Sequence, residues 1–87
     1  MSLSIKVIDV KPLDDLKLLV TFENQVKKMY DVTQLFKIFP IFKQLTNTEL
    51  FNTVRVDCGG CAICWNDEID ISEVELWDNG LEVKNHC

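Results

Sequence analysis

The chain of 87 residues is long enough for one domain, and its composition is that of a globular protein. Hydrophobic residues make up 47% and charged residues 26% of the chain, which excludes an intrinsically disordered or collagen-like protein. No apolar run reaches the ~18 residues that a membrane span requires, and the N-terminus lacks the basic and apolar regions of a signal peptide. We therefore expect a single cytoplasmic domain over residues 1–87, with no membrane partner.

Negative charge is concentrated in the last third of the chain. Residues 1–56 carry eight basic and six acidic residues, a balance of +2, whereas residues 57–87 carry one basic and eight acidic residues, a balance of −7. Nucleic-acid binding needs clustered cations that neutralise phosphates, so we expect no direct nucleic-acid partner. The acidic part is interpreted as a solvated face that aids solubility, with a docking surface for a basic protein as the alternative.

The first third of the chain has the pattern of an antiparallel meander. Three segments have strand patterning: residues 4–12, 16–22 and 26–32. The apolar phase shifts between Val7 and Ile8, which predicts either a bulge in the first strand or burial of both its faces. Asp14 and Asp15 provide the first turn, and the second contains Asn24, which we expect to have a positive φ.

Two short helices are predicted after the meander. Asp31 is a candidate N-cap for the first helix, which Pro40 should break, leaving an irregular stretch behind it. Thr46 and Glu49 form a capping box for a second helix that extends through Phe51.

The last third predicts a hairpin and a helix. Residues 54–57 and 61–65 have strand character and are joined by the turn residues Gly59 and Gly60. Ser72 begins a third capping box, which predicts a helix over residues 72–78. The predicted fold is α+β, with an antiparallel three-strand meander, two short helices, a β-hairpin and a short C-terminal helix.

Three of the four cysteines are spaced as in metal sites. Cys58, Cys61 and Cys64 have the C-x2-C-x2-C spacing seen in zinc and iron–sulfur proteins. If residues 61–65 form a strand, however, Cys61 and Cys64 lie on opposite faces with Cα atoms ~10 Å apart. We favour small hydrophobic residues over a redox-sensitive pair of Cys58 and Cys61 or a metal site of all three.

The sequence offers no catalytic set. The one histidine, His86, precedes the last residue, Cys87, and termini position a general base poorly. Asp67, Glu68 and Asp70 form a carboxylate cluster that we interpret as turn and capping residues rather than acid–base or cation-binding groups. We therefore expect a protein that is not an enzyme and has no cofactor.

The aromatic side chains are expected in the core. Trp65 and Trp77 should be buried with their indole N–H groups bound to carbonyl oxygens, and the alternative is a pair of hot spots on a partner surface. The helix phenylalanines should face the sheet rather than line a ligand pocket: Phe36, Phe39, Phe42 and Phe51.

The region from Val54 to Gly80 resembles a small bacterial family known as domain of unknown function 2442. Its most specific part is the W-N-D-x-I-D-x-S segment that begins at Trp65. The other matching stretches are Leu50-Phe51, Val54–Asp57, Gly59-Gly60, Leu76–Gly80, Val10–Phe22 and Tyr30–Val32.

The resemblance implies a small α+β fold and carries no established activity. It also implies that the gene lies beside that of another small protein, in an arrangement like a toxin–antitoxin pair. Some members are fused to a helix-turn-helix, which we do not expect here because the chain ends soon after Gly80.

Two functional hypotheses follow. The first is a non-enzymatic module that binds another small, basic protein, with these candidate partner-binding residues: Trp65, Asp67, Glu68, Asp70 and Trp77. The second is a cysteine-based metal or redox protein that uses Cys58, Cys61 and Cys64.

Overall fold

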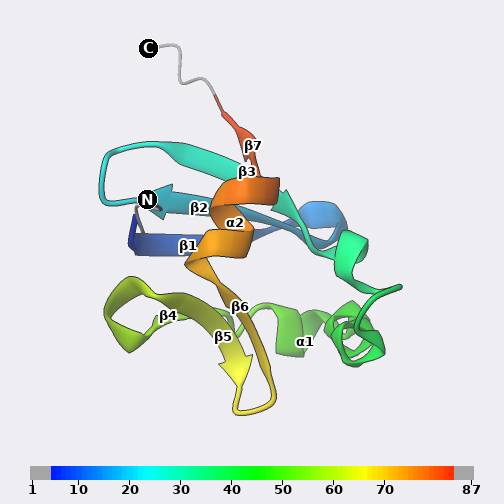
Figure 1. Ribbon diagram of the computed structural model, residues 1–87. Coiled ribbons are helices and arrows are strands. Elements are labelled where there is room, and N and C mark those ends of the chain that lie inside the picture. The colour runs from blue at the N-terminus through cyan, green and yellow to red at the C-terminus, as the bar shows by residue number, and fades with distance from the viewer. Residues whose placement is uncertain (1–4, 84–87) are drawn as a thin grey trace.

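Two antiparallel sheets lie one above the other and are connected by a short helix (Figure 1). The computed structural model describes residues 5–83, with the exception of the Cys58 side chain. The first sheet has the order β1-β2-β3-β7, formed by Val7–Leu13, Lys17–Phe22, Lys27–Asp31 and Leu81–Glu82. The second has the order β4-β5-β6, formed by Arg55–Asp57, Ala62–Asn66 and Ile69–Ser72. The predicted α+β class is confirmed.

The meander follows the predicted alternation of side chains. In β2, Leu18, Val20 and Phe22 are buried and the residues between them face outward. The register of β1 against β2 shifts between Val7 and Asp9, so the predicted bulge is confirmed.

The two turns of the meander have different conformations. The short 3-10 helix η1 (Asp14–Leu16) connects β1 to β2. In the next turn the positive φ of 75° belongs to Gln25, so the expectation for Asn24 was wrong. Asn24 contributes to the turn through its side chain instead, because its Oδ1 accepts a hydrogen bond from the Val26 N–H at 3.1 Å.

The segment after the meander contains three short helices rather than two: η2 (Val32–Leu35), η3 (Pro40–Thr46) and α1 (Thr48–Phe51). Pro40 begins η3, so the predicted irregular stretch was wrong. A first helical position suits proline, because its N–H would have no partner there and its φ is already helical. The cap of α1 is Asn47 rather than Thr46, since its side chain accepts from the Glu49 N–H at 3.0 Å.

The last third contains the predicted helix and two strands that were not predicted. Helix α2 (Glu73–Asn79) begins at Ser72, whose hydroxyl accepts from the Glu75 N–H. Gly59 and Gly60 lie in the 3-10 turn η4 (Cys58–Gly60) and have positive φ. Strands β6 and β7 were missed, so the predicted hairpin is a three-stranded sheet and β7 extends the meander.

The two sheets share one hydrophobic core. Tyr30 and Phe22 from the first sheet, Ile63 and Ile69 from the second, and Leu76 from α2 are fully buried. The packing of α2 on both β3 and β6 closes this core on one side. Within residues 5–83, no helix is long and apolar enough to cross a membrane.

Candidate functional site

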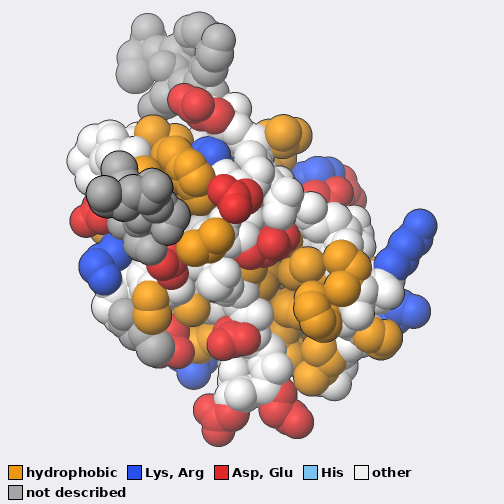
Figure 2. Space-filling model, in the orientation of Figure 1, with side chains coloured by type: hydrophobic (Ala, Val, Ile, Leu, Met, Phe, Trp, Pro, Cys, Tyr) orange, Lys and Arg blue, Asp and Glu red, His pale blue; other side chains and the backbone are white. Residues whose placement is uncertain are grey.

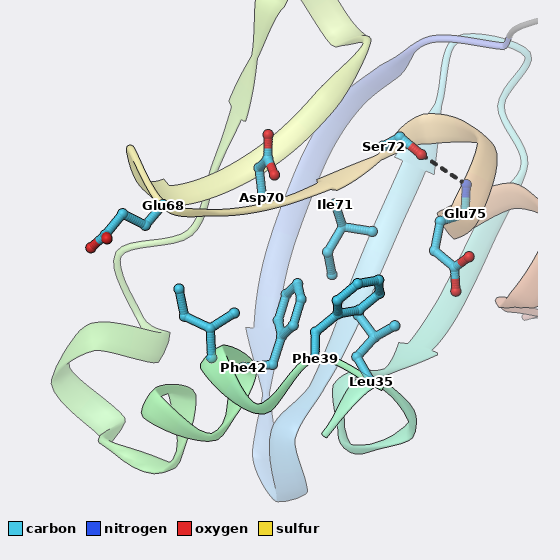
Figure 3. Close-up of a pocket in the computed structure, with 9 residues that line it drawn as sticks. Leu35, Phe39, Phe42, Glu68, Asp70, Ile71, Ser72 and Glu75 are labelled. Carbon is cyan, nitrogen blue, oxygen red and sulfur yellow. Dashed lines mark hydrogen bonds between the residues drawn. The ribbon is translucent and has the colours of Figure 1, made fainter. Parts of the chain in front are cut away.

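A groove runs between β6 and the segment that contains η2 and η3 (Figure 3). Its volume is about 350 Å³. Its apolar lining residues are Leu35, Phe39, Ile41, Phe42 and Ile71. Its polar lining residues come from β6, the turn before it and α2: Glu68, Asp70, Ser72 and Glu75.

Two aromatic rings form the apolar part of the groove. The ring of Phe42 is buried, whereas Phe39 is 52% exposed, and their centroids lie 6.2 Å apart in an edge-to-face arrangement. Ile71 points from β6 toward these rings (Figure 3). Ile38, next to Phe39, is 64% exposed. In Figure 2, hydrophobic side chains gather over this part of the surface, and Asp and Glu side chains lie along one side of them.

The expectation that Phe39 faces the sheet was wrong. Phe39 stands between η2 and η3 with an extended backbone, at φ −130° and ψ 92°. Its side chain is therefore carried by a connection and not by the inward face of a helix. Phe42 and Phe51 are buried and Phe36 is half-buried, as the sequence predicted, but Phe42 also lines the groove, against the prediction.

Carboxylates stand at both ends of the groove. Glu68 lies in the turn before β6, and Glu75 lies in the first turn of α2 (Figure 3). The Tyr30 hydroxyl donates a hydrogen bond of 2.8 Å to Glu75 Oε2. Burial raises the pKa of Tyr30, and the Glu75 carboxylate raises it further, so the phenol stays protonated as the donor. Tyr30 therefore holds Glu75 in place.

The carboxylate cluster is divided between a turn and a strand. Asp67 and Glu68 lie in the turn before β6, as expected. The turn before β6 is capped by Asn66, whose Oδ1 accepts from the N–H groups of Glu68 and Ile69 at 2.9 and 3.0 Å. Asp70 lies in β6, so its assignment to a turn was wrong. Asp70 borders the groove, but its carboxylate points away from the aromatic rings (Figure 3). Asp67 does not line the groove.

Neither tryptophan lines the groove, although Trp65 packs edge-to-face behind its Phe42 ring at 6.5 Å. Trp65 is 3% exposed and its indole N–H donates to the Phe51 carbonyl at 3.0 Å, which confirms the core interpretation and removes Trp65 from a partner surface. Trp77 is half-buried on α2, edge-to-face with Phe22 at 5.0 Å, and Lys28 Nζ lies 3.8 Å from its ring centroid. Of the five candidate partner-binding residues, only Glu68 and Asp70 line the groove.

The cysteines are not gathered around a common centre in the described part of the chain. Cys61 is half-buried and Cys64 is buried in β5. Burial raises the pKa of the Cys64 thiol, which disfavours the thiolate that metal binding requires. Residues 5–83 contain no group of three or more His, Cys, Asp or Glu side chains that could hold a metal ion. The Cys58 side chain, His86 and Cys87 lie outside the described residues.

Several groove residues were not predicted as site residues, above all Phe39, Ile41 and Glu75. A signal was present in the apolar run Ile38-Phe-Pro-Ile-Phe42, which has more hydrophobic residues than one short helix can turn inward. Glu75 carried no signal of its own, because a glutamate three residues after an N-cap serine is common in capping boxes.

The fold and the groove define a small two-sheet α+β protein with an acid-bordered apolar groove. The chain belongs to the family described as protein of unknown function (DUF2442), whose model matches residues 7–82. No curated protein and no solved structure shows a significant match to the chain.

Proposed function

We propose that this chain is a non-enzymatic interaction module that binds a basic protein partner through the groove between β6 and the η2–η3 segment. The observation that carries the proposal is an exposed apolar groove with carboxylates at both ends. Phe39 is the accessible aromatic side chain of this groove, and Glu68 and Glu75 are the charges that would select a basic partner. Interaction hot spots are typically aromatic side chains surrounded by polar groups.

The charge of the surrounding surface supports a basic partner. Residues 57–87 have a net charge of −7, and β5, β6 and α2 all belong to this segment. Complementary charge speeds encounter and disfavours partners of the same sign. The proposal includes a toxin–antitoxin-like pair, in which this chain would be the acidic member.

The proposal is tested by comparing two exposed apolar residues on different parts of the surface. The partner is captured from the host lysate with the tagged chain, identified by mass spectrometry, and titrated against purified variants. We expect Phe39→Asp to weaken binding by about tenfold or more, as for an interface hot spot. Ile8, which is 55% exposed at the β1 bulge, is the matched control, and Ile8→Asp should bind as the wild type does.

Charge is tested with the double substitution of Glu68→Gln and Glu75→Gln. It should weaken binding and also reduce its dependence on salt concentration, because two of the screened charges are removed. An acidic partner, or equal binding by Phe39→Asp and the wild type, would contradict the proposal.

A further inference from the structure

β6 is the edge strand of its sheet, so alternate residues direct their backbone N–H and C=O groups away from β5. In an antiparallel pair, hydrogen-bonded and non-hydrogen-bonded residue pairs alternate along the strands. The Glu73 N–H donates to the Cys61 carbonyl at 3.0 Å, and Ile71 pairs with Ile63 two positions along. Ile71 therefore faces β5 with its backbone groups, and the residues on either side of it, Asp70 and Ser72, direct their amides outward.

No further strand within residues 5–83 pairs with this edge of β6. β6 is the last strand of its sheet, and the alternation of residue pairs with β5 places the N–H and C=O of Asp70 on its open edge. Asp70 and Ser72 both border the groove, while the Asp70 carboxylate points away from its apolar side chains (Figure 3). The groove is thus bordered along one side by an open sheet edge.

We infer that the partner presents an extended basic segment that adds to the outer edge of β6 as a fourth strand of the β4-β5-β6 sheet. The inference rests on the proposed function and specifies how that groove is used. Main-chain hydrogen bonds to a sheet edge provide affinity in this kind of recognition, and pockets for alternate side chains provide specificity.

The lining of the groove indicates the sequence of such a segment. Alternate side chains of a strand point to the same face, so every second residue would contact Phe39, Phe42 and Ile71 and should be apolar. Glu68 and Glu75 flank β6, whose four residues span ~13 Å at ~3.3 Å per residue. Lysine or arginine residues should therefore stand at the two ends of a segment of about six residues.

The same charges disfavour two copies of this chain pairing through β6. In an antiparallel pair of β6 strands, Glu68 and Glu75 of the two copies would come close to one another, and like charges across an interface are costly. A basic partner segment converts this repulsion into attraction.

The test uses a synthetic peptide of alternating valine and threonine with an arginine at each end, labelled and followed by fluorescence anisotropy. Two further peptides carry N-methyl groups on alternate backbone amides, one on each edge of the extended chain. We expect one methylated peptide to lose at least tenfold in affinity and the other to bind as the parent peptide does. Only a strand has two edges that differ in this way.

Two substitutions of Asp70 separate the contribution of its backbone N–H from that of its charge. Asp70→Pro removes the outward N–H without removing a hydrogen bond to β5, and proline is tolerated at such edge positions. We expect Asp70→Pro to weaken peptide binding at least tenfold and Asp70→Asn, which keeps the N–H, to change it less than threefold. Circular dichroism checks that both variants are folded. If Asp70→Pro is unfolded, the comparison of the two methylated peptides is the deciding test.

The outcomes distinguish this inference from the proposed function. Equal effects of the two methylated peptides, or no binding of the parent peptide, would overturn strand addition. If Phe39→Asp still weakens capture of the natural partner, the groove remains the docking site, occupied by a helix or another shape. If Phe39→Asp has no effect on either ligand, the proposed function itself is wrong.

Discussion

Tyr30 shows how one buried side chain connects the core to the groove. Its ring is fully buried on β3, and its hydroxyl reaches Glu75 in the first turn of α2. A hydrogen bond to a charged group is stronger than one between neutral groups, and losing its donor leaves the carboxylate less well solvated. The residue therefore contributes to stability and to the orientation of a groove carboxylate.

We expect Tyr30→Phe to lower the free energy of unfolding by about 1.5 kcal/mol at pH 7. The raised pKa of Tyr30 also has a consequence at alkaline pH. Above about pH 10 the unfolded chain loses the tyrosine proton while the folded chain retains it, so the wild type loses stability as the pH rises. Urea denaturation at pH 7 and pH 11 should show the difference between wild type and Tyr30→Phe shrinking at the higher pH. A difference that grows with pH would contradict the assignment.

At the scale of elements, Ser72 joins β6 to α2. It is the last residue of the strand and the N-cap of the helix, where its hydroxyl accepts from the Glu75 N–H at 3.2 Å. The orientation of α2 relative to β6, and so the position of Glu75 at one end of the groove, depends on this junction.

We expect Ser72→Ala to destabilise the protein by about 1 kcal/mol, because the helix loses its side-chain cap. Ser72→Asp is the control, since aspartate is an equally good N-cap and should keep stability near that of the wild type. Thermal and urea denaturation measure both variants. Equal losses for alanine and aspartate would show that the hydroxyl contributes through something other than capping.

At the scale of the whole molecule, Gly60 lies where the turn η4 of the second sheet packs against the start of the first. A Cβ at Gly60 would lie 2.6 Å from the Val7 carbonyl oxygen and 2.9 Å from Lys6 Cβ, and the φ of Gly60 is 105°. Its neighbour Gly59 also has a positive φ, of 65°, but a Cβ there would meet nothing within 4 Å. The turn η4 thus packs directly on the backbone at the start of β1.

We expect Gly60→Ala to destabilise the protein by about 3 kcal/mol, from overpacking against backbone together with backbone strain. Gly59→Ala should cost only about 1 kcal/mol, because the left-handed conformation is its sole penalty. Urea denaturation of the two variants under the same conditions separates the free-energy cost of overpacking from that of the left-handed backbone conformation. Equal costs at the two glycines would mean that η4 does not pack closely on the backbone at the start of β1.

Local patterns in the sequence were sufficient for the elements whose signals lie within a few residues. The alternation in β2, the bulge at Val7 and the cap at Ser72 depend only on neighbours along the chain, and all three were predicted correctly. Of the candidate partner-binding residues, Glu68 and Asp70 line the groove, although the Asp70 carboxylate points away from its aromatic rings.

The remaining features depend on contacts between distant parts of the chain. The two-residue strand β7 exists because it pairs with β3, and Ile69 and Ile71 alternate with polar residues in a stretch too short and too acidic to predict β6 by itself. The groove forms where the η2–η3 segment and α2 both approach the edge of β6. Only the tertiary structure could place Phe39 opposite that edge, because side-chain exposure at a connection is decided by what packs beside it and not by local periodicity.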